Sequence, residues 1–501
     1  MKKLIVLLFL VSIPALIFSG FTNYTPSMLG ITTGIISSVD YENDSSFWAA
    51  TVGGGAIRFQ GEQWEIYRMS TSPINDDNVY VICVCTDVNG NIWMGTERGI
   101  AVFKDDTTWL WYDTTQGLPS NVVTAITSDN LGQKWVATQG GIASFNGSLF
   151  TKIYASTNEI DEFYSLLADG NGNLWVGSNG GLLKYNGSQW SVFDTSAGLP
   201  DLTIYDMTLD QNGVLWLATG DGLATFNGTT VTGVINNPRT NATNIFYAIE
   251  RDGAGFFWLG TLADGLLRYD GSQFISYLET GGLVNNTVKS ISINSKHERI
   301  VGTANGLSRF INESPLITSV ADSYVVEGEV YTYPLTVSDG DQETHFTFLL
   351  TQAPAGMSIG STSGLIQWSP GPSDVGTHSV TVKVTDPYGG QDLQSYNLLV
   401  DQAVQLKMER TSSPSLSRNF PNPFQHATMI RWSVPVKTTG RVEIFDQQGK
   451  ILQVLAEGSM EAGLHEHYWS GGRSASLSSG IYFYRLSTPQ ITIIQSMHFL
   501  K

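Results

Sequence analysis

The chain has 501 residues and a formal net charge of −18 at pH 7, with 52 Gly, 13 Trp and 20 Tyr. This length is too great for one hydrophobic core, and the glycines and aromatic residues favour short strands with tight turns, so we expect an all-β fold in several domains. Residues 21–402 carry a net charge of −24, which repels polyphosphate, so we expect no nucleic-acid partner.

The N-terminus has the composition of a secretory signal peptide. Two lysines precede an apolar run at 4–18, and the small residues Ser19 and Gly20 follow. The run is short for a membrane span, so we predict cleavage of residues 1–20, with a retained membrane anchor as the alternative. No later stretch is long and apolar enough to span a bilayer. We therefore predict no transmembrane span in the mature chain, and a location outside the cell or on the outer-membrane surface.

A sequence unit recurs seven times between residues 21 and 312. Its anchor residues lie 40 to 45 positions apart and are Trp48, Trp93, Trp135, Trp175, Trp216, Trp258 and Ile300. Each copy divides into four strands separated by polar or Gly turns, which is typical of the blades of a β-propeller. The last copy lacks a fourth strand and the segment 21–24 resembles one, so we predict that this segment pairs with the last blade and closes the ring. We interpret the recurring tryptophans as packing between blades rather than as sugar-stacking platforms.

The third and fourth strands of several copies are separated by Asn-Gly or Asp-Gly. These pairs lie at 146–147, 186–187, 227–228 and 270–271. Such pairs favour a type I′ hairpin, in which both central residues have φ > 0. Three of them continue as Asn-Gly-Ser/Thr, which also matches a glycosylation acceptor, but we prefer the turn interpretation.

Short motifs inside the repeat point to a family. Gly-Leu-Pro-Ser-Asn at 117–121 is echoed by Gly-Leu-Pro-Asp at 198–201 and Gly-Leu-Val-Asn-Asn at 282–286. Together with the polar turn and the Trp strand, these motifs make residues 21–312 similar to the two-component-regulator propeller repeats. In that family the repeats form periplasmic sensors of polysaccharide breakdown products in hybrid histidine kinases. Because no membrane span or kinase follows here, the resemblance implies ligand binding only.

Residues 313–402 alternate apolar and polar side chains at 331–337 and 379–384, as expected for a half-buried antiparallel sheet. We predict a β-sandwich. The segments Ala-Pro-Ala-Gly-Met at 353–357 and Gly-Leu-Ile-Gln-Trp-Ser-Pro at 364–370 make it similar to the immunoglobulin-like and cadherin-like domains of bacterial surface proteins.

A polar, Ser-rich linker is predicted at 403–418. The segment 419–501 contains Asn-Phe-Pro-Asn-Pro-Phe at 419–424, Val-Glu-Ile-Phe-Asp-Gln-Gln-Gly-Lys at 442–450 and Ser-Gly-Ile-Tyr-Phe-Tyr at 479–484. It resembles the C-terminal sorting domain of type IX secretion and is predicted to be a second sandwich. The resemblance implies export by the type IX machinery and removal of this domain. The alternative is a permanent third domain.

Candidate catalytic groups are few. Of the seven histidines only His297 lies in the propeller, too few for a His-based metal centre. Counting back from each anchor gives an innermost column in which Asp206 is the only charged residue, and Glu250 lies two positions further along the next blade. The two carboxylates are weak candidates for the acid–base pair of a glycoside hydrolase or lyase. The alternative is that they line a wet channel.

Loops between blades and between second and third strands are where ligand specificity is expected, because they vary without disturbing the blades. Candidate binding residues on them are Glu97, Arg98, Asp221, Arg239 and Asp264. In the second domain, acidic side chains are candidate Ca²⁺ ligands because calcium takes several oxygen ligands; these are Asp339, Asp341 and Asp386. Acidic turn residues without metal are the alternative. No other cofactor is expected.

Three functional hypotheses remain open at this point. The first is a secreted or surface-displayed, non-catalytic propeller that binds a ligand, with a glycan as the candidate. The second is a propeller hydrolase or lyase. The third is a surface adhesion protein or scaffold that binds another protein.

Overall fold

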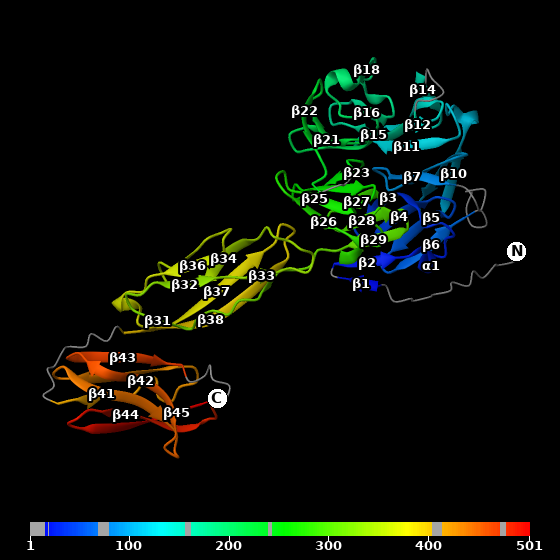
Figure 1. Cartoon of the computed structure of the whole chain (residues 1–501). Coiled ribbons are helices and arrows are strands. Elements are labelled where there is room, and N and C mark those ends of the chain that lie inside the picture. Colours follow the sequence, from blue (N-terminus) through cyan, green and yellow to red (C-terminus); the bar gives the residue numbers. More distant parts are fainter. Residues whose placement is uncertain are drawn as a thin grey trace. The chain divides into compact units, whose positions relative to one another are not determined.

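The computed structural model describes residues 16–18, 20–68, 80–155, 162–238, 243–402, 413–470 and 477–500. Residues 1–401 form one compact unit and residues 402–501 a second (Figure 1). Strands account for nearly all regular structure in both units. Among the described residues, no helix has the length and apolar character needed to cross a membrane.

Blades one to four of the propeller are antiparallel sheets of four strands each. Their strands are β3 (Ile36–Asn43), β4 (Ser46–Thr51), β5 (Gly55–Gln60) and β6 (Gln63–Tyr67); β7 (Val81–Thr86), β8 (Ile92–Thr96), β9 (Gly99–Lys104) and β10 (Thr108–Tyr112); β11 (Val123–Ser128), β12 (Lys134–Thr138), β13 (Gly141–Phe145) and β14 (Phe150–Ala155); and β15 (Phe163–Ala168), β16 (Leu174–Ser178), β17 (Gly181–Tyr185) and β18 (Trp190–Phe193).

Blades five to seven continue the same pattern. Their strands are β19 (Ile204–Leu209), β20 (Leu215–Thr219), β21 (Gly222–Phe226) and β22 (Val231–Ile235); β23 (Phe246–Arg251), β24 (Phe257–Thr261), β25 (Leu266–Tyr269) and β26 (Phe274–Tyr277); and β27 (Val288–Ile293), β28 (Arg299–Thr303) and β29 (Gly306–Phe310). The helical segments among them are short and are α1 (Pro26–Leu29), η1 (Thr114–Gln116), η2 (Thr195–Ala197) and η3 (Glu279–Gly281).

The last blade is completed by a strand from the N-terminal part of the chain. Strand β2 (Phe21–Tyr24) pairs antiparallel with β29, from Phe21 opposite Phe310 to Tyr24 opposite Leu307 (Figure 1). The first strands of the blades follow one another in a closed circle, in which β27 lies against β3. The predicted ring closure is therefore confirmed. A further short strand, β1 (Leu16–Phe18), pairs with β2 on its outer side.

Five of the six recurring tryptophans are buried between blades, as predicted, and Trp216 is half-buried. Trp48 and Trp258 are fully buried, and the exposed fractions of Trp93, Trp135 and Trp175 do not exceed 8%. The indole N–H of several of them donates to the carboxylate of the preceding polar turn, as from Trp93 to Asp87 Oδ2 at 3.0 Å. Each such pair joins a blade turn to the core, so the aromatic rings are unavailable to a ligand.

The prediction of type I′ hairpins is wrong. In the hairpin at 146–147, Phe145 pairs with Phe150, so the loop has four residues rather than two. Gly147 has φ +99°, whereas Asn146 is absent from the residues with positive φ. Its side-chain oxygen instead accepts hydrogen bonds from the backbone N–H groups of Ser148 and Leu149. The Asn side chain thus closes the loop itself.

Residues 313–401 form a β-sandwich with a core that includes Tyr331, Ile366, Trp368, Val382 and Leu398. Its principal sheets have the orders β31-β38-β37-β34 and β32-β36-β35, and β30 pairs with β33. The elements are β30 (Leu316–Ile317), β31 (Tyr324–Val326), β32 (Tyr331–Pro334), β33 (Val337–Ser338), β34 (Thr347–Gln352), β35 (Ser358–Ile359), β36 (Leu365–Trp368), η4 (Pro372–Asp374), β37 (Gly376–Thr385) and β38 (Gln391–Asp401).

This sandwich is joined to blade six by buried polar contacts. Arg268 Nη1 lies 2.5 Å from Glu343 Oε2, and both side chains are buried. The Tyr388 hydroxyl donates to Asp252 Oδ2 at 3.0 Å. Because both partners of each contact are removed from water, these contacts hold the two domains in one unit.

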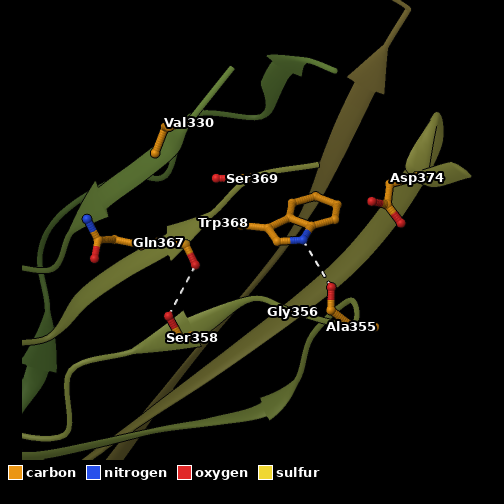
Figure 2. Close-up of a pocket in the computed structure, with 8 residues that line it drawn as sticks. All are labelled: Val330, Ala355, Gly356, Ser358, Gln367, Trp368, Ser369 and Asp374. Carbon is orange, nitrogen blue, oxygen red and sulfur yellow. Dashed lines mark hydrogen bonds between the residues drawn. The ribbon is translucent and has the colours of Figure 1, made fainter. Parts of the chain in front are cut away.

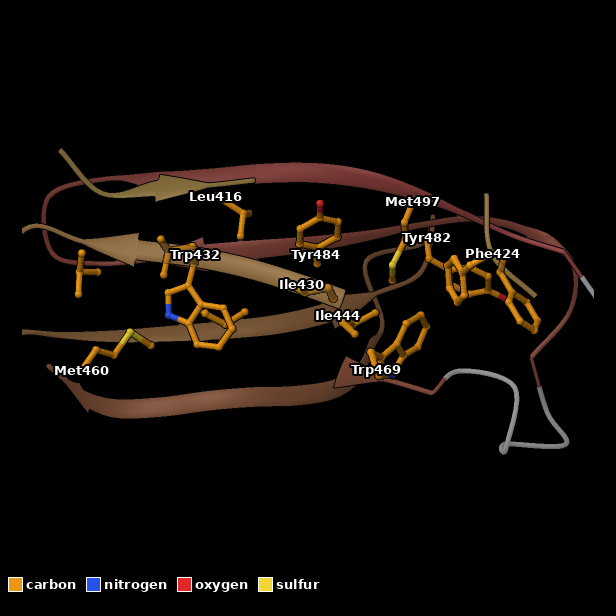
Figure 3. Packing of buried hydrophobic residues seen from close by; sticks show 14 residues of the cluster. Leu416, Phe424, Ile430, Trp432, Ile444, Met460, Trp469, Tyr482, Tyr484 and Met497 are labelled. Carbon is orange, nitrogen blue, oxygen red and sulfur yellow. The ribbon is translucent and has the colours of Figure 1, made fainter. Parts of the chain in front are cut away.

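The second unit is another sandwich, with sheet orders β39-β40-β43 and β42-β41-β44-β45. Figure 3 shows side chains of the two sheets meeting in its core, including Ile430, Trp432, Ile444, Trp469 and Tyr484. Its strands are β39 (Ser415–Leu416), β40 (Thr428–Val434), β41 (Thr438–Phe445), β42 (Ile451–Met460), β43 (Gly463–Trp469), β44 (Gly480–Ser487) and β45 (Thr492–Phe499).

Candidate ligand-binding site

Each of the seven first strands contains a β-bulge near its beginning. In β19 the pairing with β20 shifts between Ile204 and Asp206, so that Tyr205 has no partner of its own. The same shift recurs in β3, β7, β11, β15, β23 and β27. A bulge re-aims one side chain out of the regular alternation of a strand. Around the propeller the bulges therefore place seven re-aimed side chains at the end of the ring where the first strands begin, which we call the channel mouth.

The bulged residues differ sharply around this ring. They are Ser37, Ile82, Thr124, Tyr164, Tyr205, Tyr247 and Lys289. The four consecutive residues of blades four to seven form a connected row, which we call the tyrosine arc. The ring centroids of Tyr164 and Tyr205 are 5.3 Å apart, and those of Tyr205 and Tyr247 are 4.9 Å apart. Lys289 Nζ lies 3.6 Å from the centroid of the Tyr247 ring.

The tyrosine arc does not have the distribution expected of a packing element. Tryptophans recur in six of the seven blades, whereas the arc is confined to blades four to seven, on one side of the channel mouth. Its side chains are half-buried, and burial raises the pKa of Tyr164 and Tyr205, which keeps the phenols neutral. A row of neutral, partly exposed aromatic rings with hydroxyl groups can stack against a ligand and hydrogen-bond to it.

The predicted loop residues lie at the same end of the blades as the arc. The turn that contains Glu97 and Arg98 follows β8, whose last residue pairs with the first residue of β7; both side chains are exposed. Asp221 accepts a hydrogen bond from Asn244 at 2.9 Å, and Asp264 accepts one from Asn237 at 3.1 Å.

These two hydrogen bonds join neighbouring loops, so Asp221 and Asp264 also hold the loops at this end of the blades, the rim, in place. Arg239 lies outside the described residues. Ligand binding by the five loop residues remains a prediction.

The weak catalytic candidates lie deeper in the channel. The two carboxylate oxygens of Asp206 accept hydrogen bonds from the backbone N–H groups of Met207 and Ile249, each at 2.9 Å. Ile249 belongs to the next blade, so Asp206 links β19 to β23. Ser38 makes the equivalent link to Val84. Asp206 and Ser38 thus each tie a first strand to the next one, whereas the hydroxyl groups of Ser165 and Ser290 in the same column are buried without a hydrogen-bond partner.

A second ring of side chains, two positions along each strand, adds a carboxylate that sequence analysis missed. Asp40 Oδ2 accepts a hydrogen bond from the Thr86 N–H at 2.6 Å. Burial raises the pKa of Asp40 to about 6 and that of Asp206 to about 7. Burial, with the charges of Asp206 and Asp40, raises the pKa of Glu250 to about 8. Asp206 and Glu250 thus retain protons near neutral pH, whereas Asp40 retains its proton only below about pH 6.

The candidate calcium ligands belong to two different settings. Asp386 accepts bonds from the backbone N–H groups of Tyr388 and Gly390 and from the Asn312 amide, as an acidic turn residue does. Burial and a hydrogen bond with Asp339 raise the pKa of Asp341 to about 8. Within the described ranges, no group of three His, Cys, Asp or Glu side chains is arranged to hold a metal. Calcium binding by Asp339, Asp341 and Asp386 remains a prediction.

A hollow of about 360 Å³ lies in the sandwich of residues 313–401, beside Trp368 (Figure 2). The indole N–H of Trp368 donates to the Ala355 carbonyl at 3.1 Å, and the Ser358 hydroxyl is directed to the Gln367 carbonyl at 3.5 Å. The polar groups at its wall are thus engaged with one another. It has no counterpart of the tyrosine arc, which remains the stronger candidate site.

The fold and site define an all-β protein, in which a seven-bladed propeller with an aromatic channel mouth is followed by two sandwiches. Three family models match the chain, and they are the families expected from the sequence, in the expected order along the chain. Residues 73–98, 160–180 and 198–221 match the family "Two component regulator propeller". Residues 314–401 match "Putative Ig domain", and residues 418–498 match "Secretion system C-terminal sorting domain". No curated protein matches the chain.

Solved structures show the same propeller fold. The extracellular domain of the hybrid two component system BT3049 from B. thetaiotaomicron is similar at 19% identity and a TM-score of 0.50, over 76% of this chain and 57% of that one. A streptogramin B lyase is similar at 13% identity and a TM-score of 0.50, over 58% of this chain and 96% of that one. PorZ of Porphyromonas gingivalis, a surface component of the type IX secretion system, covers 93% of this chain at 16% identity and a TM-score of 0.47. The chain spans little more than half the length of the first of these relatives.

Proposed function

We propose that this protein is a surface-displayed or released propeller that binds a glycan at the tyrosine arc without transforming it. The observation that carries the proposal is the unequal ring of bulged residues, with three contacting tyrosines and a lysine on one side of the channel mouth. Sugar rings present apolar faces and hydroxyl edges, which suit phenol rings that offer both stacking and hydrogen bonding. The arc's neighbours Asp221 and Asp264 add polar groups at the rim.

The C-terminal sandwich has a separate role in this proposal. Its match to secretion sorting domains supports delivery of the chain by the type IX secretion machinery, followed by removal of this domain. The described core of this sandwich is complete on its own, with Ile430, Ile444 and Tyr484 fully buried. It can therefore fold, and be cleaved from the propeller unit, without exposing the propeller core.

The direct test is glycan-array binding by the secreted protein, followed by calorimetry on the oligosaccharides that bind. Tyr205→Ala is expected to weaken binding at least tenfold, because it removes the central ring of the arc. Tyr205→Phe keeps the ring and should retain most of the affinity. Tyr324→Ala is the matched control, since Tyr324 is 50% exposed and lies in the sandwich of residues 313–401, which stays in the secreted protein. Unaltered binding by Tyr205→Ala would place the ligand elsewhere.

A hydrolase or lyase is the second candidate, supported by the raised pKa values of Asp206 and Glu250 in one channel. A proton-bearing acid beside a second carboxyl group is the arrangement that glycoside cleavage needs. Both oxygens of Asp206 are already engaged by backbone N–H groups, which favours the binding role. Turnover of a bound oligosaccharide that is abolished by Asp206→Asn would establish the enzyme. Capture of a protein without glycan dependence would instead favour a scaffold.

A further inference from the structure

The lysine at the end of the tyrosine arc differs from four other enclosed cations of the propeller. Arg58, Lys134, Arg268 and Arg309 each lie within 3.1 Å of a carboxylate oxygen. Within the described part of the chain, Lys289 has no salt bridge, although acidic residues outnumber basic ones by 45 to 27. Its side chain is half-buried, and the ammonium group lies close over the face of the Tyr247 ring.

This position is costly for an ammonium group. Burial lowers the pKa of Lys289, which shows that its surroundings replace only part of the hydration of the charge. The cation–π contact with Tyr247 replaces part of the hydration that the ammonium group loses on burial. An anionic group placed beside Lys289 would supply the remainder through a charge-assisted hydrogen bond, which is roughly twice as strong as a neutral one.

The opposite end of the arc has the reverse polarity. The Tyr164 hydroxyl donates to Glu162 Oε2 at 2.6 Å, and the charges of Asp201 and Glu162 act on Tyr205. A ligand with negative charge along its whole length would meet these carboxylates. The arc therefore has a direction, from an acidic end in blades four and five to a cationic end in blade seven.

We infer that the glycan bound by the arc carries a single carboxylate near one end, as in an oligosaccharide with one uronic acid, and that this carboxylate pairs with Lys289. The inference rests on the proposed function. The neutral sugars then lie along Tyr247 and Tyr205 toward blade four, where the hydroxyl groups of a neutral sugar can donate to Glu162. Lys289 is thus the residue that determines charge specificity, whereas the tyrosines supply the platform.

The experiment compares the secreted protein with its Lys289→Gln and Lys289→Arg variants on an array of neutral and uronic-acid oligosaccharides. The best ligand is then measured by calorimetry beside its carboxyl-reduced form, which keeps the sugar rings and removes the charge. We expect the acid to bind the unaltered protein at least tenfold more tightly than the reduced form. Lys289→Gln should abolish this difference and Lys289→Arg should preserve it. Lys184→Gln is the matched control, because Lys184 Nζ lies 4.8 Å from the Trp175 ring away from the arc.

The outcomes separate the inference from the function on which it rests. Equal binding of the acid and its reduced form, or a preference that survives in Lys289→Gln, overturns the inference while glycan binding stands. Tighter binding of an oligosaccharide composed only of uronic acids overturns the assigned direction of the arc. If no oligosaccharide binds and Tyr205→Ala has no effect, the proposed function fails and the inference fails with it.

Discussion

Deletion of residues 21–24 from the mature chain measures how far the propeller depends on the strand that closes its ring. Phe21 and Tyr24 are each 1% exposed. The Phe21 ring stacks on Phe310 at 4.6 Å, and the Tyr24 ring contacts Phe59 at 5.0 Å. Loss of a buried aromatic side chain costs about 3 to 5 kcal/mol, so the two together contribute roughly 6 to 10 kcal/mol. That is comparable with the whole stability of an ordinary domain, about 5 to 15 kcal/mol.

The deletion should therefore unfold the propeller or lower its urea midpoint drastically, rather than merely shorten a tail. Unfolding is followed by tryptophan fluorescence, because the buried indoles lie between the blades. Phe21→Ala should give a smaller decrease, and Thr22→Ala on the same strand should change the free energy of unfolding by less than about 1 kcal/mol. A deletion variant with the urea midpoint of the unaltered protein would refute closure of the ring by β2.

Three further predictions follow from the buried charges and from the domain order. Arg268→Ala should lower the free energy of unfolding by about 3 to 5 kcal/mol, because it leaves Glu343 buried without its partner, and Arg268→Met with Glu343→Leu should recover most of that loss in urea unfolding. The folded-state pKa of Asp206 is raised to about 7, so its stabilising contribution is complete below pH 4 and is lost as the pH rises through 7. Asp206→Asn should therefore show a flatter dependence of unfolding midpoint on pH between 5 and 8. The intact mass of the secreted protein should correspond to a chain that ends within 403–418, and a mass that includes residues 419–501 would contradict removal of the sorting domain.

The sequence predicted those parts of the fold that every blade repeats. The anchors at 40- to 45-residue spacing gave the number of blades, because each tryptophan meets the same packing demand at each interface. The role of 21–24 followed from a missing fourth strand. The hairpin prediction failed because Asn146 closes its loop with its own side chain, an interaction that a pattern of φ preferences does not contain.

The candidate site was less accessible to sequence reasoning for a definite physical reason. Regular alternation assigns Asp206 and Tyr205 to opposite faces of a strand. The catalytic candidates came from the column through Asp206, so the opposite face, with Tyr205, gave no candidate. The bulge removes Tyr205 from that alternation and aims it at the channel mouth. Counting one residue further back from each anchor gives the bulge positions instead, which include Tyr164, Tyr205, Tyr247 and Lys289. Asp40 lies two residues after Ser38, the residue of that column in blade one.

The propeller thus separates stability from specificity within a single strand. Residues that are the same type in nearly every blade, such as the tryptophans and the small side chains beside the channel, hold neighbouring blades together. The bulge itself also recurs in all seven first strands within the described residues, but the side chain that it carries does not. A bulged residue has no pairing partner in the sheet, so its type can differ between blades without altering the pairing of the strands around it. The position holds Ser37 in blade one, Tyr205 in blade five and Lys289 in blade seven. A change of ligand in related chains should therefore appear first at the bulge positions and only afterwards in the blades.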